Sequence, residues 1–197
     1  MSFPSQDPFS WFESEYQKAV QAKVPEPNAM QLATVDGEGT PSIRVVYFKG
    51  FVRGGFSFYT NYNSQKAREL ARSGRASVNF FWPQLAQQVR VTGIAEKLTR
   101  EESEAYFRTR ARLSQIGAWA SEQSQEIDGP QWLERRVEDF EKRFQGQEVP
   151  CPLDWGGYHL LPLQIEFWFG QEGRLHNRYV FERFGIESAW RMYMKSP

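Results

Sequence analysis

The sequence predicts an α+β fold in which a mostly antiparallel sheet is rolled into a barrel with peripheral helices. Three observations favour this class. About six or seven segments alternate like strands, and several are joined by short turns rather than by helices. Helical patterns occur at the start, in the middle and in the 130s, so helices and strands do not alternate one for one. No glycine-rich phosphate loop opens a helix, which disfavours a doubly wound nucleotide-binding fold.

The N-terminal segment, residues 1–28, is predicted to form a short arm and an amphipathic helix. Asp7 is a typical N-cap residue, and Pro8 suits the first helical position. Prolines end the helix near Lys23, and residues 29–197 are predicted to complete a single domain. The apolar residues at helical spacing are Phe9, Phe12, Tyr16 and Val20.

Two glycine turns follow this helix. Residues 29–35 and 41–49 are strand-like, and Asp36-Gly37-Glu38-Gly39 between them is a strong hairpin signal. A second turn at Gly54-Gly55 leads into a strand at 56–60. These segments are therefore expected to pair as antiparallel neighbours.

The middle of the chain combines helices with two long strands. A short helix capped by Gly74 is predicted over 65–72, followed by strands over 76–82 and 87–98. Thr99, with Glu102 three residues on, forms a capping box that begins another helix.

Near the C-terminus, a polar amphipathic helix is predicted over 130–144, after a loop-like stretch at 121–130. Strands resume after a Trp-Gly-Gly sequence. Within 164–169, apolar side chains can face one side, with Glu166 and Trp168 on the other. This period of two indicates a half-buried strand.

A basic turn follows that strand. Gly170 and Gly173 permit a tight turn that delivers Arg174, His176 and Arg178 within five residues. The three side chains share one face if the segment stays extended. Two permanent cations and a titratable ring suit an anionic substrate on which a proton or hydride moves. The alternative is a solvated hairpin end with no role in binding.

Composition limits the functional classes. Lys and Arg number 24 against 24 Asp and Glu, so binding to nucleic acid or to an acidic membrane is not expected. The single cysteine, Cys151, cannot form an internal disulfide, which favours a reducing, cytoplasmic setting. With His159 and His176 as the histidines, no metal site is expected. The 16% of aromatic residues fits an aromatic core, a planar cofactor or a subunit interface.

Cationic and hydroxyl residues stand at the ends of predicted elements rather than in one run. If the fold brings them together, they form a phosphate site without a phosphate loop. Taken singly, each is more often a solvated surface group. No catalytic triad is expected, because neither histidine lies near a Gly-x-Ser-x-Gly sequence. The candidates are Arg44, Lys49, Thr60, Ser64, Lys66, Arg110, Ser114, Arg174 and Arg178.

Short motifs follow one another in order from Asp7-Pro8-Phe9 almost to the C-terminus. They are Arg44 to Lys49 with Gly50-Phe51, Phe58-Tyr59-Thr60-Asn61-Tyr62, Gln88-Val89-Arg90-Val91, Tyr106-Phe107-x-x-Arg110, Ser114 to Ser121, Gln123-Ser124, Trp155-Gly156-Gly157-Tyr158, Ile165-Glu166-Phe167-Trp168 and Arg174-Leu175-His176. Together they resemble the pyridoxamine 5'-phosphate oxidase family. The resemblance implies a split β-barrel and a homodimer with flavin mononucleotide (FMN) bound between the subunits.

The resemblance also implies roles for individual residues. Implied FMN contacts are Arg44, Val45, Val46, Tyr47, Phe48, Lys49, Tyr59, Thr60, Lys66, Gln88, Gln123, Ser124, Trp168 and Arg178. Implied substrate contacts are Lys49, Tyr106, Arg110, Ser114, Arg174 and His176, of which Arg174 and His176 are the implied catalytic residues. Tyr106, Arg110 and Ser114 stand at four-residue spacing and line one cup if the helical path continues.

The implied reaction oxidises pyridoxamine or pyridoxine 5'-phosphate to pyridoxal 5'-phosphate. A hydride passes to the flavin, and O2 is reduced to H2O2. Two alternatives remain open: a related flavin oxidase acting on another planar anionic ring, as in phenazine biosynthesis, and a non-catalytic protein that binds FMN or pyridoxal phosphate. Arg174 and His176 argue against the second, since a carrier needs neither.

Four departures from the family pattern stand out. Gln65 occupies a position where arginine is usual, and Asn177 replaces a common aspartate. The end of the chain, Met194 to Pro197, differs from the usual Arg-Leu-x-Pro. Asp7 lies so near the start that the N-terminal segment that covers the substrate in many members is expected to be missing. These departures bear more on substrate identity than on FMN binding.

Overall fold

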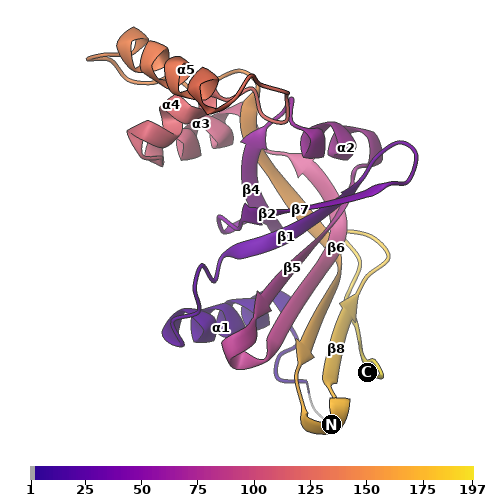
Figure 1. Cartoon of the computed structure of the whole chain (residues 1–197). Coiled ribbons are helices and arrows are strands. Elements are labelled where there is room, and N and C mark those ends of the chain that lie inside the picture. The colour runs from indigo at the N-terminus through magenta and orange to yellow at the C-terminus, as the bar shows by residue number, and fades with distance from the viewer. Residues whose placement is uncertain (1–2) are drawn as a thin grey trace.

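One strongly curved antiparallel sheet organises residues 3–197, which are the residues that the computed structural model describes (Figure 1). Residues 1–2 of the predicted arm lie outside this range. The described part contains nine strands: β1 (Ala29–Val35), β2 (Pro41–Tyr47), β3 (Phe51–Val52), β4 (Gly55–Asn61), β5 (Arg75–Trp82), β6 (Gln87–Lys97), β7 (Trp155–Phe169), β8 (Asn177–Glu182) and β9 (Arg191–Met194).

Five α-helices accompany the sheet in the described residues. They are α1 (Pro8–Gln21), α2 (Gln65–Ser73), α3 (Arg100–Thr109), α4 (Arg112–Ala120) and α5 (Pro130–Arg143). In Figure 1, α3, α4 and α5 gather at one end of the sheet and α1 lies near the other. None of these helices is both long and apolar enough to cross a bilayer.

The strand order is β2-β1-β5-β6-β7-β4-β3, with every neighbouring pair antiparallel. β7 is the longest strand, and it pairs with β4 along its first half and with β8 along its second. Beyond β2 the chain turns back against β4: the Lys49 N–H donates to the Ser57 carbonyl at 2.9 Å, and the Ser57 N–H donates to the Gly50 carbonyl at 3.0 Å. The sheet thereby curls toward a barrel without closing, which fits the predicted split barrel.

A β-bulge interrupts the pairing of β6 with β7 and adds to the curvature of the sheet. The register shifts between Thr92 and Gly93, opposite Pro162. A Cβ atom at Gly93 would lie 2.0 Å from the Leu161 carbonyl oxygen, so no other residue fits there without moving the backbone.

The core explains much of the aromatic content. Phe12 of α1 is fully buried and makes edge-to-face contacts with Phe48, Phe56 and Phe80. Trp11 stacks on Phe167 with ring centroids 4.2 Å apart. Helix α1 is therefore held on the barrel by aromatic packing, which stabilises beyond the buried area alone. A second cluster lies among α3, α4, α5 and the start of β7, and consists of Phe107, Ile116, Phe144, Val149 and Trp155.

Local signals in the sequence are confirmed at several places. The Thr99 side chain accepts the Glu102 N–H, and Glu102 reciprocates, completing the predicted capping box. Gly74 caps α2 in the left-handed conformation. The prediction was incomplete at two places, because the very short strand β3 and the separate helix α4 were not expected.

The continuous helical path from Tyr106 to Ser114, which was the condition for the shared cup, is not present. Helix α3 ends at Thr109, and Arg110 is extended, with φ −73° and ψ 147°. A new helix, α4, begins at Arg112. The four-residue spacing therefore does not place these side chains on one helix face.

Candidate functional site

A cavity of about 760 Å³ opens beside β2 and β4, under the helical end of the molecule. Its volume is in the range of cofactor and substrate pockets. The residues that line it and that the sequence marked as candidates are Arg44, Val45, Val46, Tyr47, Lys49, Tyr59, Thr60, Lys66, Tyr106, Arg110, Ser114 and Gln123. The remaining lining residues are Asn61, Ala111, Gly117, Ala118, Ser121 and Trp155.

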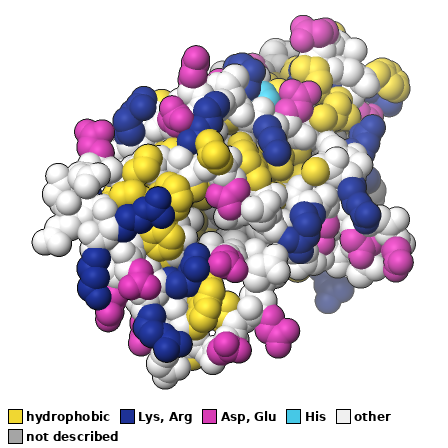
Figure 2. All heavy atoms as spheres, turned by 90° about the horizontal axis from the view of Figure 1, so that it is seen from above, with side chains coloured by type: hydrophobic (Ala, Val, Ile, Leu, Met, Phe, Trp, Pro, Cys, Tyr) yellow, Lys and Arg dark blue, Asp and Glu magenta, His cyan; other side chains and the backbone are white. Residues whose placement is uncertain are grey.

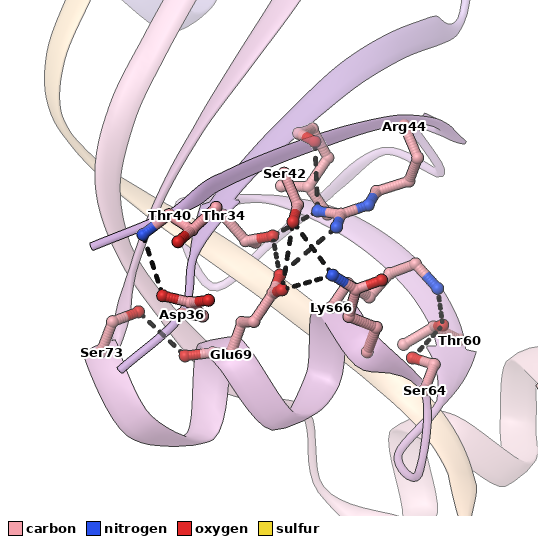
Figure 3. Close-up of polar contacts among 12 residues, drawn as sticks. Thr34, Asp36, Thr40, Ser42, Arg44, Thr60, Ser64, Lys66, Glu69 and Ser73 are labelled. Atoms are coloured by element: carbon pink, nitrogen blue, oxygen red, sulfur yellow. Dashed lines mark hydrogen bonds and ion pairs between the residues drawn. The ribbon is translucent and has the colours of Figure 1, made fainter. Parts of the chain in front are cut away.

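One group of donors lies where α2 meets β4. The Lys66 ammonium group donates to the Thr60 hydroxyl and to the Gln123 side-chain oxygen, both at 3.1 Å (Figure 3 shows Lys66 and Thr60). Lys66 is only 8% exposed, and its direct partners are neutral oxygens. Burial, with a smaller contribution from Arg44, lowers its pKa to about 8. An unneutralised cation in this position favours an anionic ligand.

A smaller hollow of about 450 Å³ adjoins the cavity through Arg44, Lys66 and Gln123. Ser124 lines this second hollow, and its backbone is left-handed, with φ 68°. Gln65 also lines it, although its amide is already engaged, donating to Glu69 at 2.8 Å and to Ser42 at 3.0 Å.

Glu69 of α2 connects the strands and the helix beside this hollow through hydrogen bonds (Figure 3). The buried carboxylate accepts hydrogen bonds from Thr34, Ser42, Arg44 and Gln65 at 2.5, 3.2, 3.3 and 2.8 Å. Burial alone would raise the pKa of Glu69, but the bonds from Thr34 and Gln65 and the charge of Arg44 outweigh it, so the pKa is lowered. Sequence reasoning missed Glu69, although its position one turn after Gln65 was a usable signal.

A second group of donors lies at the junction of α3 and α4. Tyr106 stacks on Tyr59 at 3.8 Å, and both rings are nearly parallel to the Trp155 indole. Burial, then the neighbouring Tyr106, raises the pKa of Tyr59 to about 12, so it stays protonated. The Arg110 guanidinium lies over Trp155 at 4.6 Å from the ring centroid. Tyr106, Arg110 and Ser114 therefore line one cavity even though their helix is broken.

The other predicted site residues lie elsewhere in the chain. Gln88 pairs with Trp168 across β6 and β7, and the His176 ring packs 4.6 Å from the Trp168 ring. The remaining members of this group are Arg174 and Arg178, which lie in or near the turn between β7 and β8. We call Gln88, Trp168, Arg174, His176 and Arg178 the β7–β8 group. Within residues 3–197 of one chain, none of them lines the cavity. Phe48 is likewise buried in the core.

The turn itself differs from the extended segment that the sequence suggested. Residues 172–174 form a 3₁₀ turn, and both Gly173 and Arg174 are left-handed, with φ 64° and 61°. Arg174 is exposed, whereas Arg178 grips Glu166 through two hydrogen bonds at 2.9 and 3.0 Å. The tight turn expected at Gly173 is present, but Arg174 is itself left-handed, so the condition under which Arg174, His176 and Arg178 share one extended face is not met.

Glu166 also departs from the simple alternation predicted for β7. It is 2% exposed and accepts a further hydrogen bond from Arg90 at 2.9 Å. Burial would raise the pKa of Glu166, but its two arginines lower it, and in turn the bond with Glu166 raises the pKa of Arg178. A buried carboxylate with two cationic partners is stable in this place, where a lone one would not be.

Comparison with known proteins agrees with this architecture. A family model described as pyridoxamine 5'-phosphate oxidase matches residues 16–144, and one described as pyridoxine 5'-phosphate oxidase C-terminal dimerisation region matches residues 155–197. A pyridoxine/pyridoxamine 5'-phosphate oxidase of Bdellovibrio bacteriovorus is 50% identical over 193 residues, covering 98% of both chains. One from Cupriavidus necator is 48% identical over 191 residues, covering 97% of this chain and 89% of the relative.

Two solved structures are also similar. PhzG from Burkholderia lata, solved with tetrahydrophenazine-1-carboxylic acid, is 31% identical, with a TM-score of 0.92 over 98% of this chain and 94% of that one. A pyridoxamine 5'-phosphate oxidase-related, FMN-binding protein from Nostoc punctiforme superposes with a TM-score of 0.77 over the full length of both chains. At 17% identity, that likeness concerns the fold alone.

Proposed function

The chain belongs to the pyridoxamine 5'-phosphate oxidase family, and we propose that it is an FMN-dependent oxidase that forms pyridoxal 5'-phosphate. Its substrates would be pyridoxamine 5'-phosphate or pyridoxine 5'-phosphate. The substrate carbon gives up a hydride, and O2 is reduced to H2O2; with the amine, water then replaces nitrogen and ammonia is released. The observation that carries this proposal is one cavity with two separate cationic groups, around Lys66 and around Arg110, because cofactor and substrate each bear a phosphate.

The donors around Lys66 fit the cofactor's phosphate. Lys66 has only neutral hydrogen-bond partners, and Arg44 has one carboxylate partner, Glu69, so the group keeps a net positive charge. FMN, when bound, would accept the hydride and pass its electrons to O2. The protein residues proposed to hold it from this chain are Arg44, Val45, Val46, Tyr47, Lys49, Tyr59, Thr60, Lys66, Gln123 and Ser124, whereas Phe48 lies in the core behind them.

The donors around Arg110 fit the substrate's phosphate. Arg110 supplies a planar set of N–H donors, while Tyr106 and Ser114 add hydroxyl groups from the neighbouring wall of the cavity. Lys49 lines the same cavity and is proposed to contact both ligands. Among residues 3–197, no carboxylate lies within ion-pair distance of Arg110 to compete with a phosphate.

The β7–β8 group is proposed to act on the cavity of a second copy of the chain. The C-terminal dimerisation region matches residues 155–197, which include most of this group and support a homodimer. The edge strand β2, beside the cavity, exposes Ile43, Val45 and Tyr47 on one face, which suits an interface. Figure 2 shows a band of hydrophobic side chains with Lys and Arg along it on the face displayed. FMN would then lie between the subunits.

Arg174 and His176 are proposed to act in the substrate step. The Gln171 N–H donates to His176 Nδ1 at 3.1 Å, so the neutral ring carries its proton on Nε2 and can donate it to a ring substituent of the substrate. Arg174 would lie against the substrate ring and orient the reacting carbon, where small displacements are costly.

A turnover assay tests the proposal directly. The purified protein is expected to be a yellow dimer with one FMN per chain that consumes O2 and forms H2O2 and pyridoxal 5'-phosphate from pyridoxamine 5'-phosphate. The similarity to PhzG supports a second candidate, an oxidase of another planar anionic ring. Flavin binding without turnover of either B6 phosphate would favour that candidate, and a colourless protein that stays colourless with added FMN would contradict both.

A further inference from the structure

Arg110 is held without a carboxylate. Among residues 3–197, its guanidinium forms no side-chain hydrogen bond or ion pair, and its Nη1 atom is buried without a partner. Burial lowers the pKa of Arg110, although a guanidinium remains protonated in proteins. A buried donor without a partner destabilises the folded protein, so its presence here indicates a role in binding a ligand.

Trp155 supplies the contact that a carboxylate would normally provide. The Arg110 Cζ lies 4.6 Å from the Trp155 ring centroid and 5.5 Å from that of Phe107. Trp is the most favourable aromatic partner for a cation. A contact through the flat face of a guanidinium leaves its five N–H donors, which lie in the plane of the group, free to bond elsewhere. The contact with Trp155 therefore places the group without neutralising its charge and without accepting a hydrogen bond from its donors.

The indole is itself rigidly placed. Trp155 is 5% exposed and is paired with Asn61 at the first register position of β7 and β4. Phe107 meets it edge to face at 5.0 Å, and Tyr59 lies parallel to it at 5.5 Å. The extended backbone at Arg110 ends α3 and carries the side chain to this surface. The break in the helix that overturned the spacing argument is thus what brings Arg110 to the indole.

We propose that Trp155 is a positioning residue for the substrate's phosphate, acting through Arg110. This inference rests on the proposed function and adds to it a residue that determines selectivity for phosphorylated over unphosphorylated substrates. A carboxylate in the same place would orient Arg110 but would neutralise it and occupy its donors. The indole orients the guanidinium and leaves it free to form a charge-assisted, two-pronged grip on phosphate.

The test measures how well the FMN-loaded protein binds 4-deoxypyridoxine 5'-phosphate and 4-deoxypyridoxine. Neither probe has an oxidisable group at the reacting carbon, and they differ only in the phosphate. Trp155→Leu is expected to weaken binding of the phosphorylated probe at least about tenfold, or about 1.4 kcal/mol, and to leave the other probe and the flavin content unchanged. Trp155→Phe, which keeps an aromatic face, is expected to recover much of the loss.

A double-mutant cycle shows whether Trp155 acts through Arg110. In an Arg110→Gln background, Trp155→Leu should cause almost no further loss of affinity, because the contact is already gone. The control is Trp132→Leu, which removes a similar contact on α5, with Arg136 4.7 Å from the Trp132 ring, outside the cavity. It is expected to change neither affinity.

Three results would overturn the inference. Equal losses for both probes would mean that Trp155 contacts the substrate ring or merely supports the fold. Additive losses in the cycle would mean that it acts independently of Arg110, and unchanged affinity in both Trp155 variants would mean that it has no role. Each of these three results leaves the proposed function standing. A wild-type protein that did not prefer the phosphorylated probe would instead overturn the proposed function and this inference together.

Discussion

Lys66 is an ammonium group placed among neutral oxygens, and this placement determines how it titrates. Its partners are Thr60 and Gln123, and its nearest charges are Arg44, which lowers its pKa, and Glu69, which raises it. Burial is the largest cause of the shift from 10.5 to about 8. Between these two values the unfolded chain binds more protons at Lys66 than the folded chain does, so its contribution to stability rises with pH there.

FMN binding is expected to weaken as pH rises through about 8, because the free protein then loses the Lys66 charge that the phosphate needs. Titration of the apoprotein with FMN, followed by flavin fluorescence between about pH 6.5 and 9.5, measures this. Lys66→Arg is the matched variant, since its guanidinium stays charged throughout and the decline should disappear. An equal decline in that variant would assign the effect to another group.

Gln65→Arg is expected to tighten FMN binding, most visibly at low salt. The amide now serves Ser42 and Glu69, and a guanidinium would keep the bond to Glu69 while adding a cation beside Arg44 and Lys66. A charge-assisted hydrogen bond is worth about 1.5–3 kcal/mol, and less in a wet site. Flavin titrations at two salt concentrations test it, with Gln65→Met as the uncharged control. Equal or weaker affinity would show that Glu69 takes up the whole of the added charge.

At the scale of elements, the backbone between β7 and β8 places Arg174 and His176 in a turn and Arg178 on a strand, so their side chains have different surroundings. Arg174 is left-handed and exposed, and His176 is oriented by Trp168 and by the Gln171 N–H. Arg178 lies on β8 and is bound to the buried Glu166 and to the Ser196 carbonyl. A left-handed residue other than glycine costs free energy, and such positions gather at functional sites. The two roles proposed within these five residues rest on this division.

Arg174→Lys and His176→Ala are expected to keep bound FMN and to lose at least about tenfold in kcat/KM, or about 1.4 kcal/mol of transition-state stabilisation. Lysine keeps the positive charge and has the same free-energy cost in a left-handed backbone. A loss of activity in Arg174→Lys would therefore be due to the missing planar N–H donors of the guanidinium. Flavin absorbance and steady-state oxidation of pyridoxamine 5'-phosphate are measured together. A flavin-free Arg174→Lys protein, or a fully active one, would contradict this assignment.

Arg178→Ala is expected to lose FMN. It removes the proposed cofactor contact and leaves Glu166 with Arg90 as its remaining partner. Arg90→Ala is the matched control, because it also removes one cation from Glu166 but leaves Arg178 in place. Flavin content after purification distinguishes them, and equal flavin loss in both variants would mean that Glu166 pairing, rather than Arg178 itself, is responsible.

For the whole molecule, the sheet separates two groups of proposed site residues. The cavity lies beside β2 and β4, while the β7–β8 group follows the second half of β7, which β4 does not reach. The long strand β7 thus carries Trp155 at one end and Trp168 at the other. Such an arrangement completes two equal sites if two chains pair about a twofold axis.

Mixing two inactive variants tests whether each site uses both chains. If Arg110→Ala and Arg174→Ala homodimers are mixed and allowed to exchange subunits, every heterodimer would contain one site with neither substitution. Random exchange would restore about a quarter of wild-type activity, since half of the dimers would be mixed and each would have one intact site of two. Activity that stays absent after confirmed exchange would place both residues in a site formed by one chain.

The predictions made from sequence alone held where neighbouring residues decide the structure. The capping box at Thr99, the glycine cap at Gly74 and the alternating burial along β1 and β5 depend on local geometry, and all three are present. The family and its split barrel were also predictable, because ordered motifs extend along most of the chain. The single-domain boundaries and the roles of individual site residues stay predictions.

Tertiary structure decided the features that depend on residues far apart in the chain. Spacing would put Tyr106, Arg110 and Ser114 on one face only if their helix continued; the helix ends at Thr109, yet all three line one cavity. Glu69 and Glu166 looked like ordinary charged positions, and only their burial beside arginines shows that they orient cations. Local spacing determines which face of a helix or strand a side chain occupies. Burial and partners from distant parts of the chain determine its charge state and its hydrogen-bond partners.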